Sequence, residues 1–352
     1  MITLEELLVN LQDAGGSDLH VTAGSPPRVR VDGGLVELDY EMLSPDLSQK
    51  IIYAILDAEQ IAKFEKDKEL DLSFGISGLG RYRCNVYFQR GAVAAAFRVI
   101  PFDIKNFTQL GLNVPLCEKM CNLPKGLILI TGATGSGKST TLAAMINYIN
   151  ESDTRHIITI EDPIEFIHKN KKCLINQREV GPDTHGFAMA LRSVLRQDPD
   201  VVLIGEMRDM ETIEAGLTLA ETGHLTFATL HTSDATQTIN RIIDVFPANQ
   251  QAQIRTQLSF VLEAVFCQQL PKKSSGKGRF LAYELMMGTD AVRALIRDGK
   301  VHQIYSQLQI GGKYGMNTMN QSLYENSKLG NITLEDSLRY STNVDDLKKL
   351  HS

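Results

Sequence analysis

An eight-residue segment between an apolar run and a helix-like run constrains this chain more than any other feature. Residues 132–139 follow the P-loop pattern, with glycine at the first position and Gly-Lys-Ser at the end. Branched apolar residues fill 127–130 before it, and apolar side chains recur at helical spacing over 142–149 after it. The sequence therefore predicts a buried parallel strand, a phosphate-binding turn and a helix, in this order.

Each position of this loop has a chemical task in binding a nucleotide. Glycines let successive backbone N–H groups point at a phosphate chain above the positive end of the helix. The ammonium of Lys138 is expected to contact the β- and γ-phosphates, and the hydroxyl of Ser139 to complete the shell of a magnesium ion. ATP and Mg²⁺ are thus the expected ligands. The predicted nucleotide-binding residues are Gly132, Thr134, Gly135, Ser136, Gly137, Lys138, Ser139 and Thr140.

The composition is that of a globular chain long enough for two domains. Its 352 residues are 43% apolar, carry a formal net charge of −6 and contain no apolar run of membrane-spanning length. Residues 1–8 are typical of an acidic amphipathic helix and not of a basic export leader, which predicts a cytoplasmic protein. The acidic balance argues against nucleic acid as the main ligand. Five cysteines without a CxxC pair argue against disulfides and a structural zinc site.

The pattern along the chain predicts two domains joined by a linker. Residues 1–100 combine a first helix, several strand-like runs and a helical stretch at 51–64, which indicates a small sheet with helices on it. Residues 101–114 have no clean period and are predicted to be a linker or hinge. From 115 to 352, apolar strands alternate with helical segments, which predicts an α/β domain with a largely parallel, doubly wound sheet.

Carboxylates follow two of these strands, at the edge where doubly wound sheets bind their ligands. One strand ends in Glu161, with Glu165 four residues later, and one of the two is expected to polarise the attacking water. Glu161 is the first choice because it is closer to the strand end, and solvated turn residues are the alternative. Another strand ends in Gly205 and Glu206, a Walker B arrangement with glycine in place of the usual aspartate. Glu206 is expected either to reach the magnesium shell or to orient the nucleophile.

Two histidines flank the next predicted strand, His224 before it and His231 after it. Seven positions of extended chain place them on opposite faces, which argues against a shared metal site. At least one is expected to sense the γ-phosphate through a hydrogen bond, and a purely structural histidine is the alternative for each. Both are therefore candidate catalytic residues.

These motifs together resemble the secretion ATPases of type II secretion and type IV pili. The P-loop, the acidic box 161–165, the segment 205–209 and the two histidines occur in that family's order, and the resemblance extends from Ser17 onward. It is closest to the pilus-retraction branch, because residues 17–20 and 291–298 are similar to the N- and C-terminal signatures of that branch. The extension and secretion branches usually have an added N-terminal domain and a four-cysteine zinc loop, neither of which is recognisable here.

The resemblance implies a fold, an activity and partners. The fold is a small PAS-like α+β N-terminal domain followed by a RecA-like P-loop ATPase domain. The activity is ATP hydrolysis by a homohexamer that retracts a type IV pilus at the inner face of the cytoplasmic membrane. The implied partners are an inner-membrane pilus platform protein and other pilus ATPases, with no nucleic acid. The alternatives are a pilus-extension or type II secretion ATPase and a RecA-like nucleic-acid translocase.

A ring of subunits gives a role to arginines of the first domain. Arg81 and Arg83 alternate on one predicted strand, and Arg98 lies on a later one. Arginines carried by a hinged domain are expected to stabilise the charge of the leaving γ-phosphate. Ordinary surface arginines are the alternative.

A short helix is predicted in the segment 289–300, where Arg293 and Arg297 lie four residues apart. Like charges at this spacing disfavour an isolated helix, so the pair predicts an acidic neighbour. The resemblance implies that this segment transmits force, whereas a solvated helix face is the alternative.

Overall fold

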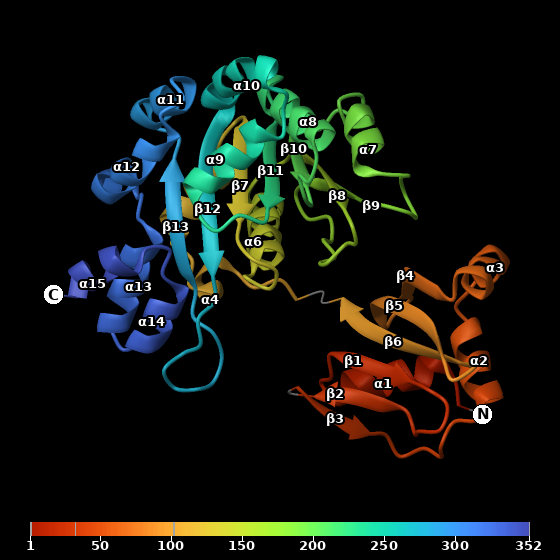
Figure 1. The fold of residues 1–352 in the computed structure, drawn as a ribbon. Coiled ribbons are helices and arrows are strands. Elements are labelled where there is room, and N and C mark those ends of the chain that lie inside the picture. The colour runs from red at the N-terminus through yellow and green to blue at the C-terminus, as the bar shows by residue number, and fades with distance from the viewer. Residues whose placement is uncertain (1, 32, 101–102, 352) are drawn as a thin grey trace. The chain divides into compact units, whose positions relative to one another are not determined.

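The computed structural model describes residues 2–31, 33–100 and 103–351. The chain divides into two compact units, Met1–Asp103 and Ile104–Ser352 (Figure 1). Each unit has its own hydrophobic core, the first built on an antiparallel sheet and the second on a mostly parallel one. This α/β architecture confirms the predicted fold class.

The first unit is a six-stranded sheet in the order β3-β2-β1-β6-β5-β4, with every neighbouring pair antiparallel. Apolar residues recur every three or four positions along its first helix, so this helix buries one leucine face in the core. A capping box between Thr3 and Glu6 satisfies the first N–H groups of the helix. The elements are α1 (Leu4–Asp13), β1 (Asp18–Val21), β2 (Arg28–Val31), β3 (Gly34–Glu37), α2 (Pro45–Tyr53), α3 (Ala58–Asp67), β4 (Glu69–Ile76), β5 (Gly80–Gln89) and β6 (Ala92–Ile100).

The single helix predicted at 51–64 is wrong, because the chain forms two helices there, α2 and α3. Asp57 has extended backbone angles and accepts a hydrogen bond from the Gln60 N–H, while the Gln60 side chain accepts one from the Asp57 N–H. This capping box starts a new helix at a position where an apolar period alone indicates continuation.

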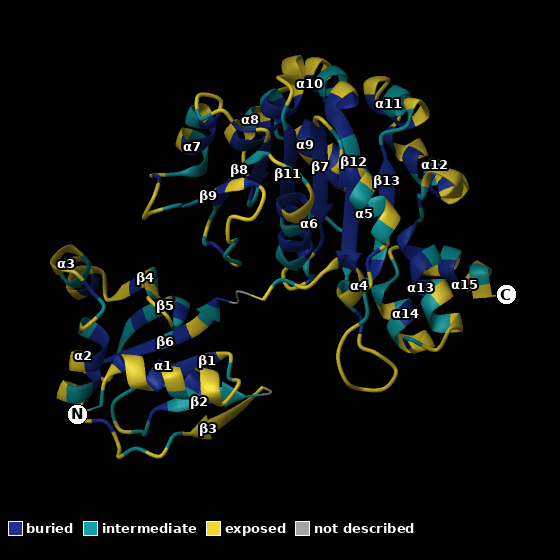
Figure 2. Cartoon of the chain, turned by 180° about the vertical axis from the view of Figure 1, so that it is seen from behind, coloured by how far each residue is buried: buried dark blue, intermediate teal, exposed yellow. Residues whose placement is uncertain are grey.

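The second unit is a seven-stranded sheet in the order β13-β12-β7-β11-β10-β8-β9. All neighbouring strands are parallel except β13, which pairs antiparallel with β12. The central strands β7, β10 and β11 are buried at every residue, and Figure 2 shows β7 and β11 in dark blue. The strands are β7 (Gly126–Thr131), β8 (His156–Glu161), β9 (Leu174–Glu179), β10 (Val201–Ile204), β11 (Leu225–Leu230), β12 (Leu262–Gln269) and β13 (Ala282–Met287).

Helices lie between and after these strands and complete the predicted alternation. They are α4 (Phe107–Leu110), α5 (Val114–Cys121), α6 (Lys138–Ser152), α7 (Phe187–Val194), α8 (Met210–Glu221), α9 (Ala235–Asp244), α10 (Ala248–Val261), α11 (Asp290–Arg297), α12 (Ile304–Ile310), α13 (Met319–Lys328), α14 (Leu334–Tyr340) and α15 (Val344–His351), with short 3₁₀ turns at Val301–Gln303 and Gly311–Tyr314. Among the described residues, no helix combines the length and apolarity that crossing a membrane requires.

Most of the segment predicted as a linker, 101–114, is packed in the second unit. Residues 101–102 lie outside the described residues, and 104–114 belong to the second unit. Phe107 and Leu112 are each only 5% exposed in its core, and the Phe107 ring contacts that of Tyr148 at a centroid distance of 5.4 Å. Burial of these two side chains stabilises a defined conformation in a stretch that has no sequence period.

Candidate nucleotide-binding site

The P-loop joins β7 to α6, as the sequence predicted, and its glycines have backbone angles that other residues rarely adopt. The φ angles of Gly132, Gly135 and Gly137 are 139°, 78° and 93°. A Cβ atom at Gly132 would lie 2.4 Å from the Gln268 carbonyl oxygen and 2.5 Å from the Ser136 hydroxyl oxygen, so only glycine has room there. No side chain caps the N-terminus of α6. Its first N–H groups are thus suited to bind an anionic ligand.

Lys138, the first residue of α6, is folded against the loop that precedes it. Its side chain is mostly buried, and its ammonium group donates to the carbonyl oxygens of Gly132 at 2.8 Å and Ala133 at 3.1 Å. Burial lowers the pKa of Lys138, and the carboxylates of Glu206 and Glu165 act in the opposite direction. The two acidic groups therefore lie close enough to favour the charged ammonium.

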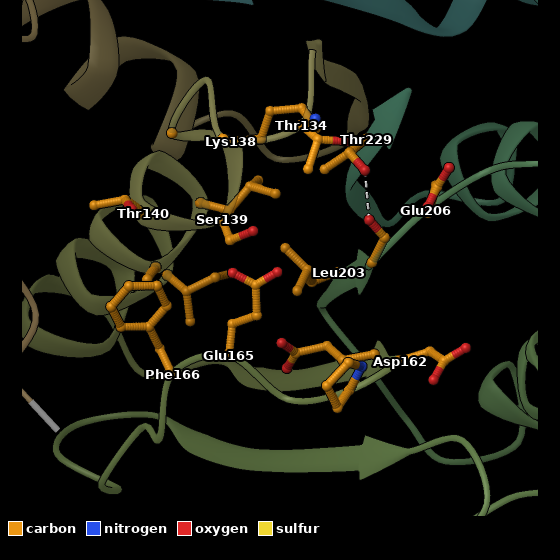
Figure 3. Close-up of a pocket in the computed structure, with 18 of the residues that line it drawn as sticks. Thr134, Lys138, Ser139, Thr140, Asp162, Glu165, Phe166, Leu203, Glu206 and Thr229 are labelled. Carbon is orange, nitrogen blue, oxygen red and sulfur yellow. Dashed lines mark hydrogen bonds between the residues drawn. The ribbon is translucent and has the colours of Figure 1, made fainter. Parts of the chain in front are cut away.

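A pocket of about 320 Å³ opens beside the P-loop, at the carboxyl ends of β8, β10 and β11 (Figure 3). Parallel strands bring residues that are far apart in the sequence to this common edge. Ten of the predicted site residues line it, namely Thr134, Gly135, Gly137, Lys138, Ser139, Thr140, Glu161, Glu165, Glu206 and His231. Gly132 and Ser136 are not among the lining residues and instead shape the loop.

Glu206 follows β10 and makes two polar contacts in the pocket. One carboxylate oxygen lies 2.8 Å from the Arg208 guanidinium, and the other lies 3.3 Å from Nε2 of His231, which follows the neighbouring strand β11. The Glu206 side chain is 19% exposed, so these contacts are partly shielded from water. The Walker B carboxylate and the histidine thus form one connected group.

The structure accounts for Gly205, which occupies the position where a Walker B motif usually has an aspartate. A Cβ atom there would lie 3.0 Å from the carbonyl oxygen of Ile160 and 3.2 Å from Cα of Glu161, both backbone atoms at the end of β8. The Gly205 N–H also donates to the Ile160 carbonyl at 2.8 Å. Close approach of these two backbones leaves little room for a side chain at Gly205, and the acidic residue at this strand end is Glu206.

The two carboxylates after β8 have different surroundings. Glu161 accepts hydrogen bonds from the Thr159 hydroxyl at 2.7 Å, from the Gln177 amide at 3.1 Å and from the backbone N–H of Glu165. Burial nevertheless raises the pKa of Glu161. Glu165 is exposed, and Figure 3 shows its side chain pointing into the pocket. Glu161 is therefore held by its neighbours, whereas Glu165 faces the space where a ligand binds.

The structure separates the two histidines. His224 precedes β11, and its Nδ1 atom lies 3.0 Å from the Leu219 carbonyl oxygen and 3.1 Å from the Thr222 hydroxyl. It is absent from the residues that line the pocket, in contrast to His231. The six residues of the buried strand β11 lie between them, so one histidine is at each end of the strand. Within this unit, His224 has the surroundings of a structural residue.

The predicted arginines of the first unit lie on one face of its sheet. Arg83 and Arg98 are direct cross-strand neighbours, and Arg81 lies two residues before Arg83. Arg98 pairs with Asp18 at 2.7 Å, and Arg83 is 3.9 Å from Asp71. Arg81 donates to the Ser73 hydroxyl at 2.8 Å. The side chains of Arg98 and Arg83 remain 70% and 48% exposed, so a further anionic partner has access to both.

Several residues that line the pocket were not predicted. Arg279 reaches it from the loop before β13 and donates to the Gly135 carbonyl oxygen at 3.2 Å, across a sequence separation of 144 residues. Arg208 lies only two residues after Glu206, inside the family-like segment 205–209, so the sequence contained a signal for it. Arg279 belongs to no recognisable motif. It directly follows residues 272–278, a segment whose glycine, serine and lysine content indicates only a flexible, basic loop. The other unpredicted lining residues are Leu142, Ala143, Ile146, Asp162, Pro163, Phe166, His168, Phe187, Leu203, Gly205 and Thr229.

Comparison with known proteins identifies the family. The model of the type II/IV secretion system protein family matches residues 94–339. The chain is 49% identical over 320 residues to the type IV pilus retraction ATPase PilT of Pseudomonas aeruginosa, which covers 91% of this chain and 92% of the relative. It is 45% identical over 322 residues to a twitching motility protein of Neisseria gonorrhoeae, covering 91% of this chain and 86% of that protein.

A solved structure is similar over almost the full length. It is the crystal structure of the pilus retraction motor PilT with bound ADP, with a TM-score of 0.93, 50% sequence identity, and coverage of 99% of this chain and 100% of that one. Both units and the pocket lie inside the matched region. The chain therefore belongs to the type II/IV secretion system protein family, among its pilus-retraction ATPases.

Proposed function

We propose that this chain is an ATP-hydrolysing motor that powers the retraction of type IV pili. The observation that carries the proposal is the convergence of Lys138, Glu165, Glu206 and His231 on one pocket beside an uncapped helix N-terminus. The near full-length similarity to the ADP-bound retraction motor supports the same activity. The reaction is the attack of water on the γ-phosphate of ATP, which releases ADP and phosphate.

Phosphate binding uses the backbone of the P-loop and the charge of Lys138. The N–H groups at the start of α6 carry partial positive charge and have no side-chain acceptor at the helix cap. The Lys138 ammonium exchanges two neutral carbonyl acceptors for phosphate oxygens, which form stronger, charge-assisted hydrogen bonds. Ser139 and Thr140, the next two residues in the first turn of the same helix, add hydroxyl groups.

The oxygen donors in the pocket suit a magnesium ion. The hydroxyl of Ser139 and the carboxylate of Glu206, directly or through water, are hard oxygen ligands of the kind that Mg²⁺ prefers. The ion supplies positive charge that neutralises the phosphate oxygens when it is bound. Arg208 and His231 already contact the two Glu206 oxygens and hold the carboxylate in one orientation.

Glu165 is the better candidate to polarise the attacking water, although the sequence favoured Glu161. A general base needs an accessible carboxylate within reach of the water, and Glu165 faces the pocket. Three donors engage Glu161, one of them the backbone N–H of Glu165. Glu161 thus positions the segment that carries Glu165. His231 reports the state of the γ-phosphate through its contact with Glu206.

The motor is proposed to act as a homohexamer with sites completed between chains. Arg83 and Arg98 are exposed on one sheet face of the first unit together with Arg81, as arginines donated to a neighbouring phosphate site require. His224, predicted as a candidate catalytic residue, lies outside the pocket of its own chain and has no role in this proposal. The proposed partners are an inner-membrane pilus platform protein and other pilus ATPases, with no nucleic acid. The proposed location is the cytoplasm, at the inner face of the cytoplasmic membrane.

Removal of charge from the phosphate site tests the enzymatic part of this proposal. Lys138→Ala and Glu206→Ala are expected to abolish magnesium-dependent ATP turnover while circular dichroism shows an unchanged fold. Turnover near wild type in either folded variant contradicts the assignment.

Deletion of the gene tests the direction of motion. Loss of a retraction motor is expected to leave cells with surplus surface pili and no twitching, whereas loss of an extension motor is expected to leave cells without pili. A nucleic-acid translocase requires salt-dependent binding to single strands by the purified chain.

A further inference from the structure

Glu284 is a buried acidic residue that does not line the pocket. It lies in β13, is only 1% exposed, and its two carboxylate oxygens contact different helices. Oε1 accepts a hydrogen bond from the backbone N–H of Ala235 at 2.8 Å, and Oε2 accepts one from that of Met319 at 3.2 Å. One carboxylate thus joins two segments that are 84 residues apart in the sequence.

Both donors are the first residues of helices, α9 and α13. Each helix already has a side-chain cap, because Asp234 accepts from the Gln237 N–H and Thr318 accepts from the Gln321 N–H. Those caps leave the first N–H of each helix without an intrahelical acceptor. Glu284 supplies that acceptor to both helices, at the positive end of each helix dipole.

The α9 contact lies directly behind the histidine of the pocket. His231 follows β11, and only residues 232–234 separate it from Ala235. The Thr232 hydroxyl lies 2.7 Å from that of Thr238 in α9, which shortens the free part of this loop further. The position of the α9 N-terminus therefore sets the position from which His231 reaches Glu206.

The α13 contact lies at the start of the C-terminal helices α13–α15, which Figure 1 shows beside the beginning of β13. These helices share a small separate core, which consists of Ala282, Met319, Leu323, Ile332 and Leu347. The Asn320 amide donates to the Asn343 carbonyl at 2.7 Å and to the Asp346 carboxylate at 3.1 Å. A displacement of this bundle consequently moves the Met319 N–H relative to β13.

We propose that Glu284 is a positioning residue that couples the His231 loop to the C-terminal helices α13–α15. A shift of α13 changes the hydrogen bonding of Glu284 and hence the position of the α9 N-terminus, and a shift of the His231 loop acts in the reverse direction. This inference rests on the proposed function of His231 in ATP hydrolysis. The coupling gives the C-terminal bundle an effect on catalysis without any contact with the nucleotide.

Glu284→Gln separates the two contacts with little change in volume. The amide keeps one acceptor oxygen and replaces the other by an NH₂ group, which has only donors to offer to a backbone N–H. A glutamine therefore satisfies one helix N-terminus and not the other. Ser322→Ala is a matched control, because the Ser322 hydroxyl joins α13 to β13 by accepting the Tyr283 N–H at 3.2 Å and does not touch the His231 loop.

A double-mutant cycle with His231→Ala tests the coupling. Glu284→Gln is expected to lower kcat about tenfold and to leave KM for ATP within about twofold, because the nucleotide contacts are untouched. In the His231→Ala background, Glu284→Gln is expected to cause no further loss. Ser322→Ala is expected to keep the wild-type kcat.

Two outcomes overturn the inference alone: wild-type kcat in Glu284→Gln, or equal fractional losses with and without His231. Wild-type turnover in His231→Ala instead overturns the catalytic role proposed for that residue. If Glu284→Gln does not fold, backbone amide hydrogen exchange on the wild-type chain tests the coupling instead. A non-hydrolysable ATP analogue is expected to change exchange at the N-termini of both α9 and α13, and a change at α9 alone contradicts the coupling.

Discussion

Glu165 and Glu161 lie four residues apart, yet their surroundings predict different losses on substitution. Glu165→Gln removes the carboxylate that faces the pocket and is expected to lower kcat by roughly 10²- to 10⁴-fold. Glu161→Gln removes a carboxylate that three donors already engage, so the expected loss is smaller. Steady-state turnover of both variants at saturating ATP measures the difference. A larger loss of kcat in Glu161→Gln than in Glu165→Gln contradicts this assignment and identifies Glu161 as the general base.

Glu284 gives the folded chain a pH dependence that the sequence does not indicate. Burial raises the pKa of Glu284 to about 7 from 4.5, and its two backbone hydrogen bonds act in the opposite direction. A raised pKa means that its contribution to stability is fully present below about pH 4.5 and is lost as pH rises through 7. The change amounts to roughly 3 kcal/mol over this window.

Urea unfolding at pH 5 and pH 8 checks this expectation against Glu284→Gln, which has no ionisable group at this position. Between pH 5 and pH 8, the free energy of unfolding of the wild type is expected to fall relative to that of the variant. An equal pH dependence in both proteins contradicts the assigned pKa direction.

At this scale, contiguous motifs predicted residues that the structure brings to one pocket, whereas an isolated residue was missed. Lys138 and Ser139 were predicted from the P-loop pattern, and Glu206 was predicted because the carboxyl ends of parallel strands share one edge. His231 was found for the same reason, but its motif partner His224 lies at the opposite end of β11. Arg279 was missed because it reaches the P-loop from a distant loop, and only tertiary structure brings the two together.

At the scale of elements, apolar periodicity predicted the alternation of strands and helices, and local hydrogen bonds and packing explain two departures from the prediction. The capping box at Asp57 divides one apolar period into two helices. Phe107 and Leu112 pack a stretch that has no period of its own. Both effects depend on partners that pattern alone does not reveal, either a side chain three residues away or a core formed by distant strands.

Two arginines of α11, Arg293 and Arg297, have different surroundings although they lie four residues apart in the sequence. Arg293 donates to the carbonyl oxygens of Gly288, Ser259 and Phe260 at 2.7 to 2.8 Å and pairs with Glu263 at 2.8 Å, so Glu263 is the predicted acidic neighbour. Arg297 is exposed. Arg293 thus anchors α11 to the end of α10, and of the two arginines only Arg297 is exposed to a further partner.

Single substitutions distinguish these two roles. Arg293→Gln is expected to reduce the free energy of unfolding by roughly 1–3 kcal/mol, because it leaves several partly buried acceptors unpaired. Arg297→Gln is expected to leave unfolding and ATP turnover unchanged while cells keep pili that they do not retract. Urea denaturation and a twitching assay measure both effects. Equal destabilisation by the two variants contradicts the anchoring role.

At the scale of the whole molecule, the proposed role of the arginines of the first unit predicts sites that are shared between chains. Mixing Arg81→Ala/Arg83→Ala subunits with Lys138→Ala subunits is expected to restore part of the turnover, because some sites then combine an intact P-loop with intact arginines. Loss of one such arginine costs roughly 10³- to 10⁵-fold in other enzymes of this chemistry. Absence of rescue at every mixing ratio means that each chain hydrolyses ATP alone.

Retraction of labelled pili in living cells tests most directly whether hydrolysis in this pocket drives the motor. The chromosomal gene is replaced by the Glu206→Ala variant, immunoblotting confirms normal protein levels, and fluorescence microscopy records the extension and retraction of individual pili. The expected result is that pili extend and accumulate while retraction events disappear. Retraction at the wild-type frequency in cells that contain only the Glu206→Ala chain contradicts the central claim.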